Sequence, residues 1–418
     1  MRLILPRGDE GGGPVNLPEP DPRTVRRTPR VSVVRGTYQI NVPELGIYAQ
    51  LAQHGFAPEL IAPRRCALDD HEAGMPVRRL AVPRLAGRIS RTLAGGYLLG
   101  RVSPYRYFHE YLRGLPQALK QTDVAIPVDL GHPTSHQCLE AEPRPKVVVQ
   151  VWDNIPFNWP EDRPLARHYE EVLEQADHFL ALTDDADRAL RLQGVETSRR
   201  SRVNIGIDLE EFRPPSVEEA RRARQDLGVG PEEVVFAFLG RVEFWKGIFT
   251  LLEALGLIQV PLRLLVVGGG AGLSRARWLS RKLRLESRVF FRGPVPHAEL
   301  QPRVLWGIDG VVIPSIPTPQ WREQFGQAFL EAMAVGLPVI GSRTGAVPEL
   351  VQDGVTGLLV PPDSPEDLRR ALEELGSDGD LRRRYGQAGR RWAESRYNVG
   401  GQAATLAAIL KRKVLLDP

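Results

Sequence analysis

The second half of the chain alternates short apolar runs, of a length typical of strands, with longer segments that have helical spacing. The apolar runs lie near residues 234–240, 262–268, 288–291, 309–314, 338–342 and 357–360. Regular alternation of strands and helices is typical of a parallel sheet that is covered by helices on both faces. The sequence therefore predicts an α/β fold with a doubly wound sheet for this half of the chain.

The first half of the chain starts with residues 1–30, which are rich in Gly, Pro, Asp and Arg and which we expect to form a mobile arm. Apolar runs follow at residues 31–34, 58–62, 122–128, 146–151 and 179–182. The first two flank a helical segment with Pro43 in its first turn, as in a βαβ unit. Because 418 residues are too many for one ordinary core, we expect two domains, residues 1–214 and 215–396.

Composition limits the cellular compartments in which such a chain is expected. No run of about 18 apolar residues is present, so we expect no helix that spans a membrane. The apolar part of the N-terminus is too short for a signal peptide. The two cysteines, Cys66 and Cys138, have no metal-binding or redox spacing. Together these features favour a cytoplasmic protein with reduced thiols.

Residues 64–120 form a basic stretch in which arginines are interleaved with aromatic and apolar residues. Such a surface can lie against an anionic membrane, which would place the protein peripherally at the inner face. It could instead bind an acidic acceptor, or be the solvated face of amphipathic helices. No nucleic-acid-binding motif accompanies the charge, so nucleic acid is not an expected partner.

The stretch from Glu323 to Ser342 combines several signals. A helix is expected to start near Phe325 and Gly326 and to end at Gly336, a residue that readily adopts positive φ. A helix N-terminus that follows a strand offers free backbone N–H groups to a phosphate. Glu323 and Glu331 stand on either side of this N-terminus, and carboxylates accept hydrogen bonds from hydroxyls. The pattern favours a ligand with phosphates between two hydroxylated groups.

The same stretch carries a resemblance to a known family. Its Glu-x7-Glu spacing, with Phe-Gly after the first Glu and Gly-Leu-Pro-Val-Ile after the second, resembles the signature of family 4 glycosyltransferases. Residues 344–350 and 354–360 are also similar to that family. The resemblance is strong from about residue 234 to 395 and looser before it.

The resemblance implies the GT-B architecture, in which two Rossmann-like domains face each other across a cleft. A nucleotide-diphosphate sugar donor would bind the second domain and an acceptor the first. The implied activity is transfer of a sugar, a hexose by expectation, with retention of anomeric configuration. Residues 397–418 would form a helix that crosses back to the first domain. Residues 202–214 are similar to the family's interdomain stretch, here with Ile205 inserted.

The resemblance also assigns roles to individual residues. It places Glu331 on the ribose and Glu323 on the donor sugar. Phe325, Gly326 and Gln327 would contact the sugar and phosphate through their backbone. Arg241 and Lys246 lie where family members place an Arg–Lys pair on the diphosphate. The expected donor site further includes Gly240, Gly293 and Ser315.

No metal and no cofactor are expected. Two cations and a helix N-terminus can together carry the charge of a diphosphate leaving group. Transferases that depend on a metal use Asp-x-Asp, and two such patterns occur here, at residues 185–187 and 378–380. Both stand at expected helix starts, where capping explains an aspartate.

The acceptor side departs from the family pattern. Many members carry His-Asp-x-x-Pro after a first-domain strand, whereas residues 152–156 here read Trp-Asp-Asn-Ile-Pro. An indole cannot accept a proton, so Trp152 is expected to provide an apolar surface against the donor sugar or the acceptor ring. Asp153 and His132 are then the nearby groups that can accept a proton, and Asn154 is also expected on the acceptor side. A donor phosphate oxygen is a third possible base, and it suits retention best.

Other classes of protein share this architecture. A sugar phosphorylase or a nucleotide-sugar epimerase is one alternative, and a non-catalytic nucleotide-sugar binder is another. A non-catalytic binder would be expected to have lost Arg241, Lys246 or Glu323, and all three are present. The sequence does not define the base and sugar of the donor, or the acceptor.

Overall fold

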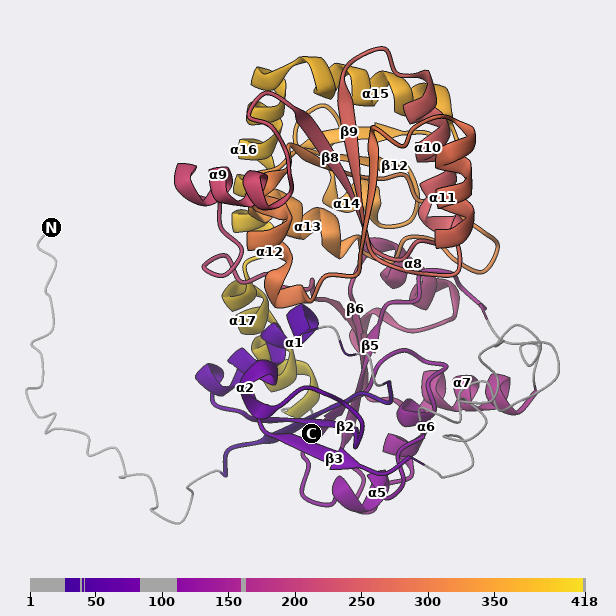
Figure 1. The fold of residues 1–418 in the computed structure, drawn as a ribbon. Coiled ribbons are helices and arrows are strands. Elements are labelled where there is room, and N and C mark those ends of the chain that lie inside the picture. Colours follow the sequence, from indigo (N-terminus) through magenta and orange to yellow (C-terminus); the bar gives the residue numbers. More distant parts are fainter. Residues whose placement is uncertain (1–26, 38–39, 41, 83–110, 159–162, 416–418) are drawn as a thin grey trace, which may run out of the picture.

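The computed structural model describes residues 27–37, 40, 42–82, 111–158 and 163–415, and these residues build two domains (Figure 1). The first domain lies below the second in this view. The arm expected at residues 1–30 falls almost entirely outside the described residues.

The first domain contains a seven-stranded sheet in the order β3-β2-β1-β4-β5-β6-β7, and every pair of neighbouring strands is parallel. Its strands are β1 (Arg30–Val34), β2 (Ala57–Pro63), β3 (Val77–Leu80), β4 (Val124–Ile126), β5 (Lys146–Val151), β6 (His178–Ala181) and β7 (Arg200–Arg202). The central strands are apolar runs buried on both faces, as parallel sheets require. The expected strands are all present, whereas β3 and β7, at the two edges, were missed.

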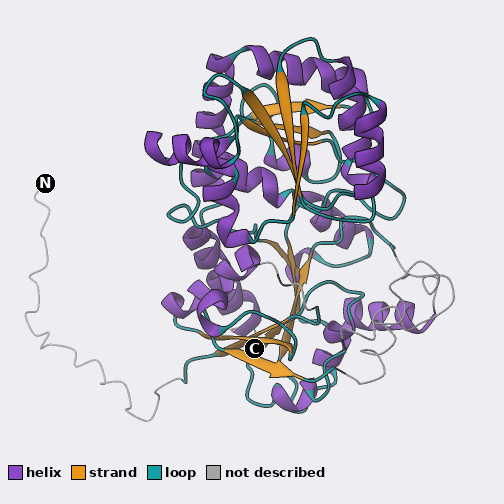
Figure 2. Cartoon of the chain, in the orientation of Figure 1, coloured by secondary structure: helices purple, strands orange, loops and turns teal. Residues whose placement is uncertain are grey.

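Helices cover both faces of this sheet (Figure 2). They are α1 (Val42–Ala49), η1 (Gln50–His54), α2 (Asp70–Ala73), α5 (Leu115–Ala118), α6 (Pro133–Leu139), α7 (Arg163–Gln175), α8 (Asp184–Leu192) and η3 (Thr197–Arg199). The single helix expected after β1 is an α-helix, α1, that tightens into the 3₁₀ turn η1 before Gly55. The cysteines of this domain, Cys66 and Cys138, are free and buried.

The second domain contains a six-stranded parallel sheet in the order β10-β9-β8-β11-β12-β13. Its strands are β8 (Val234–Leu239), β9 (Leu262–Val267), β10 (Val289–Gly293), β11 (Gly310–Ile313), β12 (Val339–Ser342) and β13 (Gly357–Val360). Each lies where the sequence predicts a strand. The predicted α/β fold with two doubly wound sheets is therefore confirmed.

The helices of this domain pack on both faces of its sheet (Figure 1). They are α9 (Val217–Asp226), η4 (Phe244–Lys246), α10 (Ile248–Leu257), α11 (Leu273–Lys282), η5 (His297–Glu299), α12 (Leu300–Arg303), η6 (Leu305–Gly307), α13 (Gln327–Ala334), α14 (Val347–Leu350), α15 (Pro365–Ser377) and α16 (Gly379–Arg396). The helix α13 starts after Gly326, at φ 90°, and ends before Gly336, at φ 85°. Both helix boundaries agree with the prediction.

Each sheet has one switch point, where adjacent strands lead into connections on opposite faces. The switch point lies between β1 and β4 in the first domain and between β8 and β11 in the second. Ligands of doubly wound sheets bind in the crevice at the carboxyl ends of these strands. The residues that follow β4, β8 and β11 are Pro127–Asp129, Gly240–Arg241 and Pro314–Ser315. Topology therefore brings the expected site residues to the crevices.

The end of the chain returns to the first domain. The helix α17 (Val399–Ile409) packs on α1 and η1, and the π-helical turn η7 (Leu410–Leu415) continues it. Leu406 and Leu410 are fully buried in the same core as Leu45 and Leu51. The preceding helix, α16, packs instead on α13 of the second domain. The C-terminal segment thus links the two cores.

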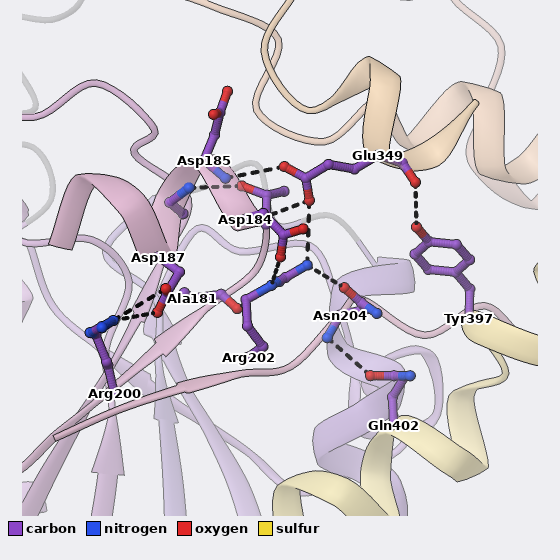
Figure 3. Close-up of polar contacts among 12 residues, drawn as sticks. Ala181, Asp184, Asp185, Asp187, Arg200, Arg202, Asn204, Glu349, Tyr397 and Gln402 are labelled. Carbon is purple, nitrogen blue, oxygen red and sulfur yellow. Dashed lines mark hydrogen bonds and ion pairs between the residues drawn. The ribbon is translucent and has the colours of Figure 1, made fainter. Parts of the chain in front are cut away.

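A polar network also joins the domains (Figure 3). The carboxylate of Glu349 in α14 accepts hydrogen bonds from the backbone N–H groups of Asp184 (2.7 Å) and Asp185 (3.1 Å), at the start of α8. Arg202 lies 3.4 Å from Glu349 and 2.8 Å from the carboxylate of Asp184. A carboxylate of the second domain therefore satisfies the N-terminus of a first-domain helix, where negative charge is stabilised.

The same network corrects the interpretation of one Asp-x-Asp pattern. The side chain that caps α8 is Thr183, which accepts a hydrogen bond from Ala186 N, while Asp187 pairs with Arg200 at 3.2 Å. In the other pattern, Asp378 does cap α16, accepting from Leu381 N at 2.8 Å. Both patterns thus have structural roles, but capping accounts for only one.

Candidate functional site

Glycines clear a space at the carboxyl ends of β8, β9 and β10. Gly240, Gly268 and Gly293 all have positive φ, at 130°, 137° and 82°. A Cβ on Gly268 would lie 1.8 Å from the carbonyl oxygen of Gly240, so only glycine fits there. Around Gly240 and Gly293 a Cβ would meet nothing within 4 Å. The space next to the backbone is therefore open at two of the expected donor-binding positions.

Glu323 is the centre of the candidate donor site. Its side chain is buried, and its carboxylate lies 2.7 and 3.0 Å from Lys246 Nζ. The hydroxyl of Ser315 donates a further hydrogen bond to Glu323 Oε2 at 2.7 Å. The structure thus brings together three predicted residues from two connections, Lys246 after β8 and both Ser315 and Glu323 between β11 and α13. Ser315 contributes by holding Glu323.

Two tryptophans support the cations of this site. Lys246 Nζ lies 5.1 Å from the centre of the Trp321 ring, and the guanidinium of Arg241 lies 5.7 Å from that of Trp245. The two indole rings are 6.2 Å apart. Cation–π contacts of this kind hold a cation near an aromatic face without neutralising it. Arg241 is exposed, so its charge is accessible to an anionic ligand.

Glu331 lies one turn into α13 and is almost fully buried. Its Oε1 accepts a hydrogen bond from Gln327 Nε2 at 2.9 Å and faces His297 Nε2 at 3.0 Å. Burial opposes protonation of His297, but its hydrogen bond to Glu331 and the charges of Glu331 and Glu211 raise its pKa above the ordinary value. The Glu331 carboxylate therefore already has partners before any ligand binds. Sequence analysis missed His297, which begins the short 3₁₀ helix η5 after β10, where the sequence carries no local pattern.

Phe325 and Gly326 shape the start of α13. The Phe325 side chain is buried edge-on against Tyr397, with ring centres 5.9 Å apart, so the backbone is the part of this residue that faces the helix N-terminus. At Gly326 a Cβ would lie 2.9 Å from the ring of Phe329, and its φ of 90° favours glycine. Both positions are compatible with the predicted backbone contacts.

A cavity of about 170 Å³ lies between the domains, and we call it the acceptor cavity. Its lining residues are Asp129, Gly131, His132, Asp153, Asn154, Ile155, Asn158, Tyr169, Gln320, Trp321, Arg322 and Gln324. Arg322 and Gln324 flank Glu323 in the chain, and Trp321 contacts Lys246. The acceptor cavity therefore adjoins the candidate donor site. It contains the predicted residues His132, Asp153 and Asn154.

Two carboxylates stand together in this cavity. Asp129, in a left-handed conformation at φ 50°, accepts hydrogen bonds from the backbone N–H groups of Trp152 (2.7 Å) and Asp153 (3.1 Å). Burial raises the pKa of Asp129. Burial, with the neighbouring charge of Asp129, also raises the pKa of Asp153 to about 6. Sequence analysis expected Asp153 and His132 on the acceptor side but assigned no role to Asp129.

Two residues predicted on the acceptor side, Asn154 and Trp152, contact the second domain in the structure. Asn154 is buried, and its Nδ2 donates to the main-chain oxygen of Glu323 at 3.0 Å, so it holds the loop before α13. Trp152 is absent from the cavity lining and packs instead against the core of the second domain. Both side chains thus join the domains.

The described residues also bear on metal binding and membrane contact. Within them, no group of three or more His, Cys, Asp or Glu side chains is arranged to hold a metal ion, and no helix is long and apolar enough to cross a bilayer. Of the basic stretch, Arg78 pairs with Glu59 at 3.3 Å, and Arg79 donates to Leu68 O at 2.5 Å. Residues 83–110 lie outside the described residues, so membrane contact stays a prediction.

Comparison with known sequences agrees with this site. Residues 219–392 match the family model described as glycosyl transferases group 1. The matched residues make up most of the second domain, which is therefore similar to this family. One curated relative, a D-inositol 3-phosphate glycosyltransferase from Streptomyces bingchenggensis, is 34% identical over 57% of this chain and 54% of its own length. Another of the same name, from Mycobacterium marinum, is 34% identical over 49% of this chain and 43% of its own length. The chain thus spans about half the length of the curated relatives it matches.

Solved structures share the whole two-domain architecture. Anabaena Alr3699/HepE, whose crystal structure is a complex with UDP, is 18% identical and superposes with a TM-score of 0.73 over 92% of this chain and 99% of its own. Sucrose-phosphate synthase from Thermosynechococcus elongatus is 21% identical, with a TM-score of 0.72 over 93% of this chain and 100% of its own. At these identities the likeness shows the fold, and the predicted GT-B architecture is confirmed.

The carboxylate pair of the acceptor cavity predicts a pH-dependent stability. The folded-state pKa of Asp153 is raised, so its contribution is most favourable below the unfolded-state pKa and is lost as the pH rises through about 6. Asp153→Asn removes this charge. We expect the substitution to increase the free energy of unfolding at pH 8 by about 2 kcal/mol and to have little effect at pH 4.

Thermal unfolding at the two pH values checks this expectation. Asp226→Asn is the matched control, because Asp226 is an exposed carboxylate outside the cavity. An equal effect of Asp153→Asn at both pH values would contradict the assignment of a raised pKa.

Proposed function

We propose that the protein is a glycosyltransferase that moves a sugar, a hexose by expectation, from a nucleotide-diphosphate sugar to an acceptor hydroxyl. The observation that carries the proposal is the buried contact of Glu323 with Lys246 and Ser315, next to the N-terminus of α13 and the glycine-lined strand ends. The family match of the second domain supports it, as does the UDP bound to a structural neighbour, Alr3699/HepE.

The donor would lie along the second domain. Glu331 would accept hydrogen bonds from the ribose hydroxyls, and Glu323 from the hydroxyls of the donor sugar. Arg241, Lys246 and the backbone N–H groups at the start of α13 would bind the diphosphate between them. Lys246 carries three N–H donors, so it can contact a phosphate oxygen while it keeps its contact with Glu323.

Transfer would proceed with retention and without a metal. The acceptor oxygen bonds to the anomeric carbon while the bond from that carbon to the diphosphate oxygen breaks. The bonding electron pair leaves with the nucleoside diphosphate, and the proton of the acceptor passes to a diphosphate oxygen on the same face. The cations and the α13 N-terminus stabilise the charge that develops on the leaving group.

A screen of nucleotide sugars tests both the activity and the independence from metal. We expect slow hydrolysis of one donor without an acceptor, read as release of the free nucleoside diphosphate. Excess EDTA should leave the rate unchanged, because Arg241, Lys246 and the helix N-terminus carry the charge. A loss of activity that magnesium restores would contradict metal independence, and no release from any donor would contradict the activity.

The two carboxylates should have different kinetic roles. Glu331→Ala should weaken binding of the nucleoside diphosphate by about tenfold or more, because the ribose contact exists before and during the reaction. Glu323→Ala should mainly lower kcat, because Glu323 would contact the reacting sugar. Isothermal titration with the nucleoside diphosphate found in the screen, alongside kcat measurements, distinguishes them. Equal losses of affinity in both variants would rule out this division of roles.

The proton route predicts that no single side-chain base is essential. Asp153→Asn and His132→Ala should each keep measurable transfer, since a donor oxygen takes the proton. The pH–rate profile should lack an acidic limb that disappears with either substitution, even though the raised pKa of Asp153, about 6, would place such a limb in an accessible range. Loss of transfer in one variant, with donor binding and folding intact, would identify that residue as the base.

A further inference from the structure

The acceptor cavity has negative charge on its first-domain side. Asp129 and Asp153 both line it, and the backbone N–H of Asp153 donates directly to the carboxylate of Asp129. Asp129 also accepts from Trp152 N, and Asp153 accepts from Ile155 N at 3.1 Å. A side-chain hydrogen bond from Asn158 lowers the pKa of Asp153 against the larger effect of burial. These donors are neutral amides, so they hold the two carboxylates without cancelling their charge.

The positive charge around the same cavity is placed differently. Arg322 is exposed at the second-domain side, where water and salt screen it. The charge of His132 acts on Asp129, whose pKa it lowers against the larger effect of burial. The nearby cations Lys246 and Arg241 belong to the proposed diphosphate site. Phosphate sites usually gather several cations and backbone donors, whereas the lining described here has one arginine and one histidine alongside two carboxylates.

The remaining lining groups suit hydroxyls. Asn158, Gln320 and Gln324 carry amides that both donate and accept hydrogen bonds. The carboxylates accept from hydroxyl groups, and the indole of Trp321 offers a flat apolar surface against which a ring can pack. This combination of acceptors, amides and one aromatic ring matches a compact, polyhydroxylated molecule.

We propose that the part of the acceptor that enters this cavity is an uncharged polyhydroxylated ring, a sugar or a cyclitol, that carries no phosphate. The inference rests on the proposed glycosyl transfer and adds the class of acceptor. It sets this chain apart from relatives whose name specifies inositol 3-phosphate, which match about half of the chain. A phosphate bound here would lie against Asp129 and Asp153, and like charges at close range strongly disfavour binding.

Matched pairs of acceptors test the proposal, once the donor screen has identified a donor. The pairs are myo-inositol with myo-inositol 3-phosphate and glucose with glucose 6-phosphate. We expect transfer to the neutral member with a kcat/KM at least about tenfold higher than to its phosphate. Preference for the phosphorylated members would overturn the proposal. Transfer to neither set, while hydrolysis of the donor persists, would overturn it as well.

Removing one of the two negative charges tests whether the carboxylates cause the preference for neutral acceptors. Asp129→Asn keeps an oxygen for the two backbone N–H groups, and asparagine tolerates the left-handed conformation of this residue. The preference for neutral acceptors should shrink by about threefold or more in this variant. Asp226→Asn, which changes the net charge equally but lies outside the cavity, should leave the preference unchanged. An unchanged preference in Asp129→Asn would contradict the role of the carboxylates.

A second variant keeps the test decisive if Asp129→Asn does not fold. Arg322→Gln removes the exposed cation of the cavity, and we expect it to widen the preference for neutral acceptors. If the cavity instead binds a phosphate through Arg322, this variant should lose transfer to phosphorylated acceptors, which would overturn the proposal. Absence of donor hydrolysis in the wild-type protein is a different outcome, since it contradicts the proposed glycosyl transfer itself.

Discussion

The ion pair between Glu323 and Lys246 determines how the second domain is built around its crevice. Taking two charges out of water is costly unless their remaining hydrogen-bonding positions are satisfied, and here Ser315 supplies a further donor. The two connections that carry these residues, one after β8 and one between β11 and α13, must therefore pack closely. A Cβ on Gly247 would lie 1.9 Å from Pro314 O, and one on Gly345 would lie 2.1 Å from Glu323 O. Glycine at these two positions thus permits the close backbone packing around the ion pair.

The fold could be predicted from the sequence where local patterns and burial agree. Strands such as β8 and β11 are continuous apolar runs because both faces are covered, and α13 is bounded by two glycines with positive φ. The edge strands β3 and β7 escaped prediction because they are short and rich in arginine, which an edge tolerates and a central strand does not. Tertiary pairing, which no local pattern encodes, makes these segments strands.

The candidate site was predictable only in part for a similar reason. Glu323, Lys246 and Glu331 lie in motifs that resemble a known family, and the topology of the sheet explains why Lys246 and Glu323 meet. His297, Trp321 and Asp129 stand in the connections that follow strands, where the sequence carries no periodic signal. Their roles depend on neighbours far along the chain. Asn154 is the opposite case, because its sequence motif did suggest a role. The motif predicted an acceptor contact, whereas the side chain donates a hydrogen bond to a loop of the other domain.

The contacts between the domains converge on the segment that carries Glu323. The main-chain oxygen of Glu323 accepts hydrogen bonds from Asn154 Nδ2 of the first domain (3.0 Å) and from Ala346 N (2.9 Å). Ala346 directly precedes α14, whose Glu349 satisfies the N-terminus of α8. One short unit of the second domain therefore holds the candidate sugar-binding carboxylate and takes part in these two interdomain contacts. A ligand that moves only the Lys246 side chain leaves this unit intact, whereas a rotation of the domains must break the Asn154 contact or carry Glu323 with it. The position of Glu323 and the opening of the acceptor cavity are for this reason coupled through backbone hydrogen bonds.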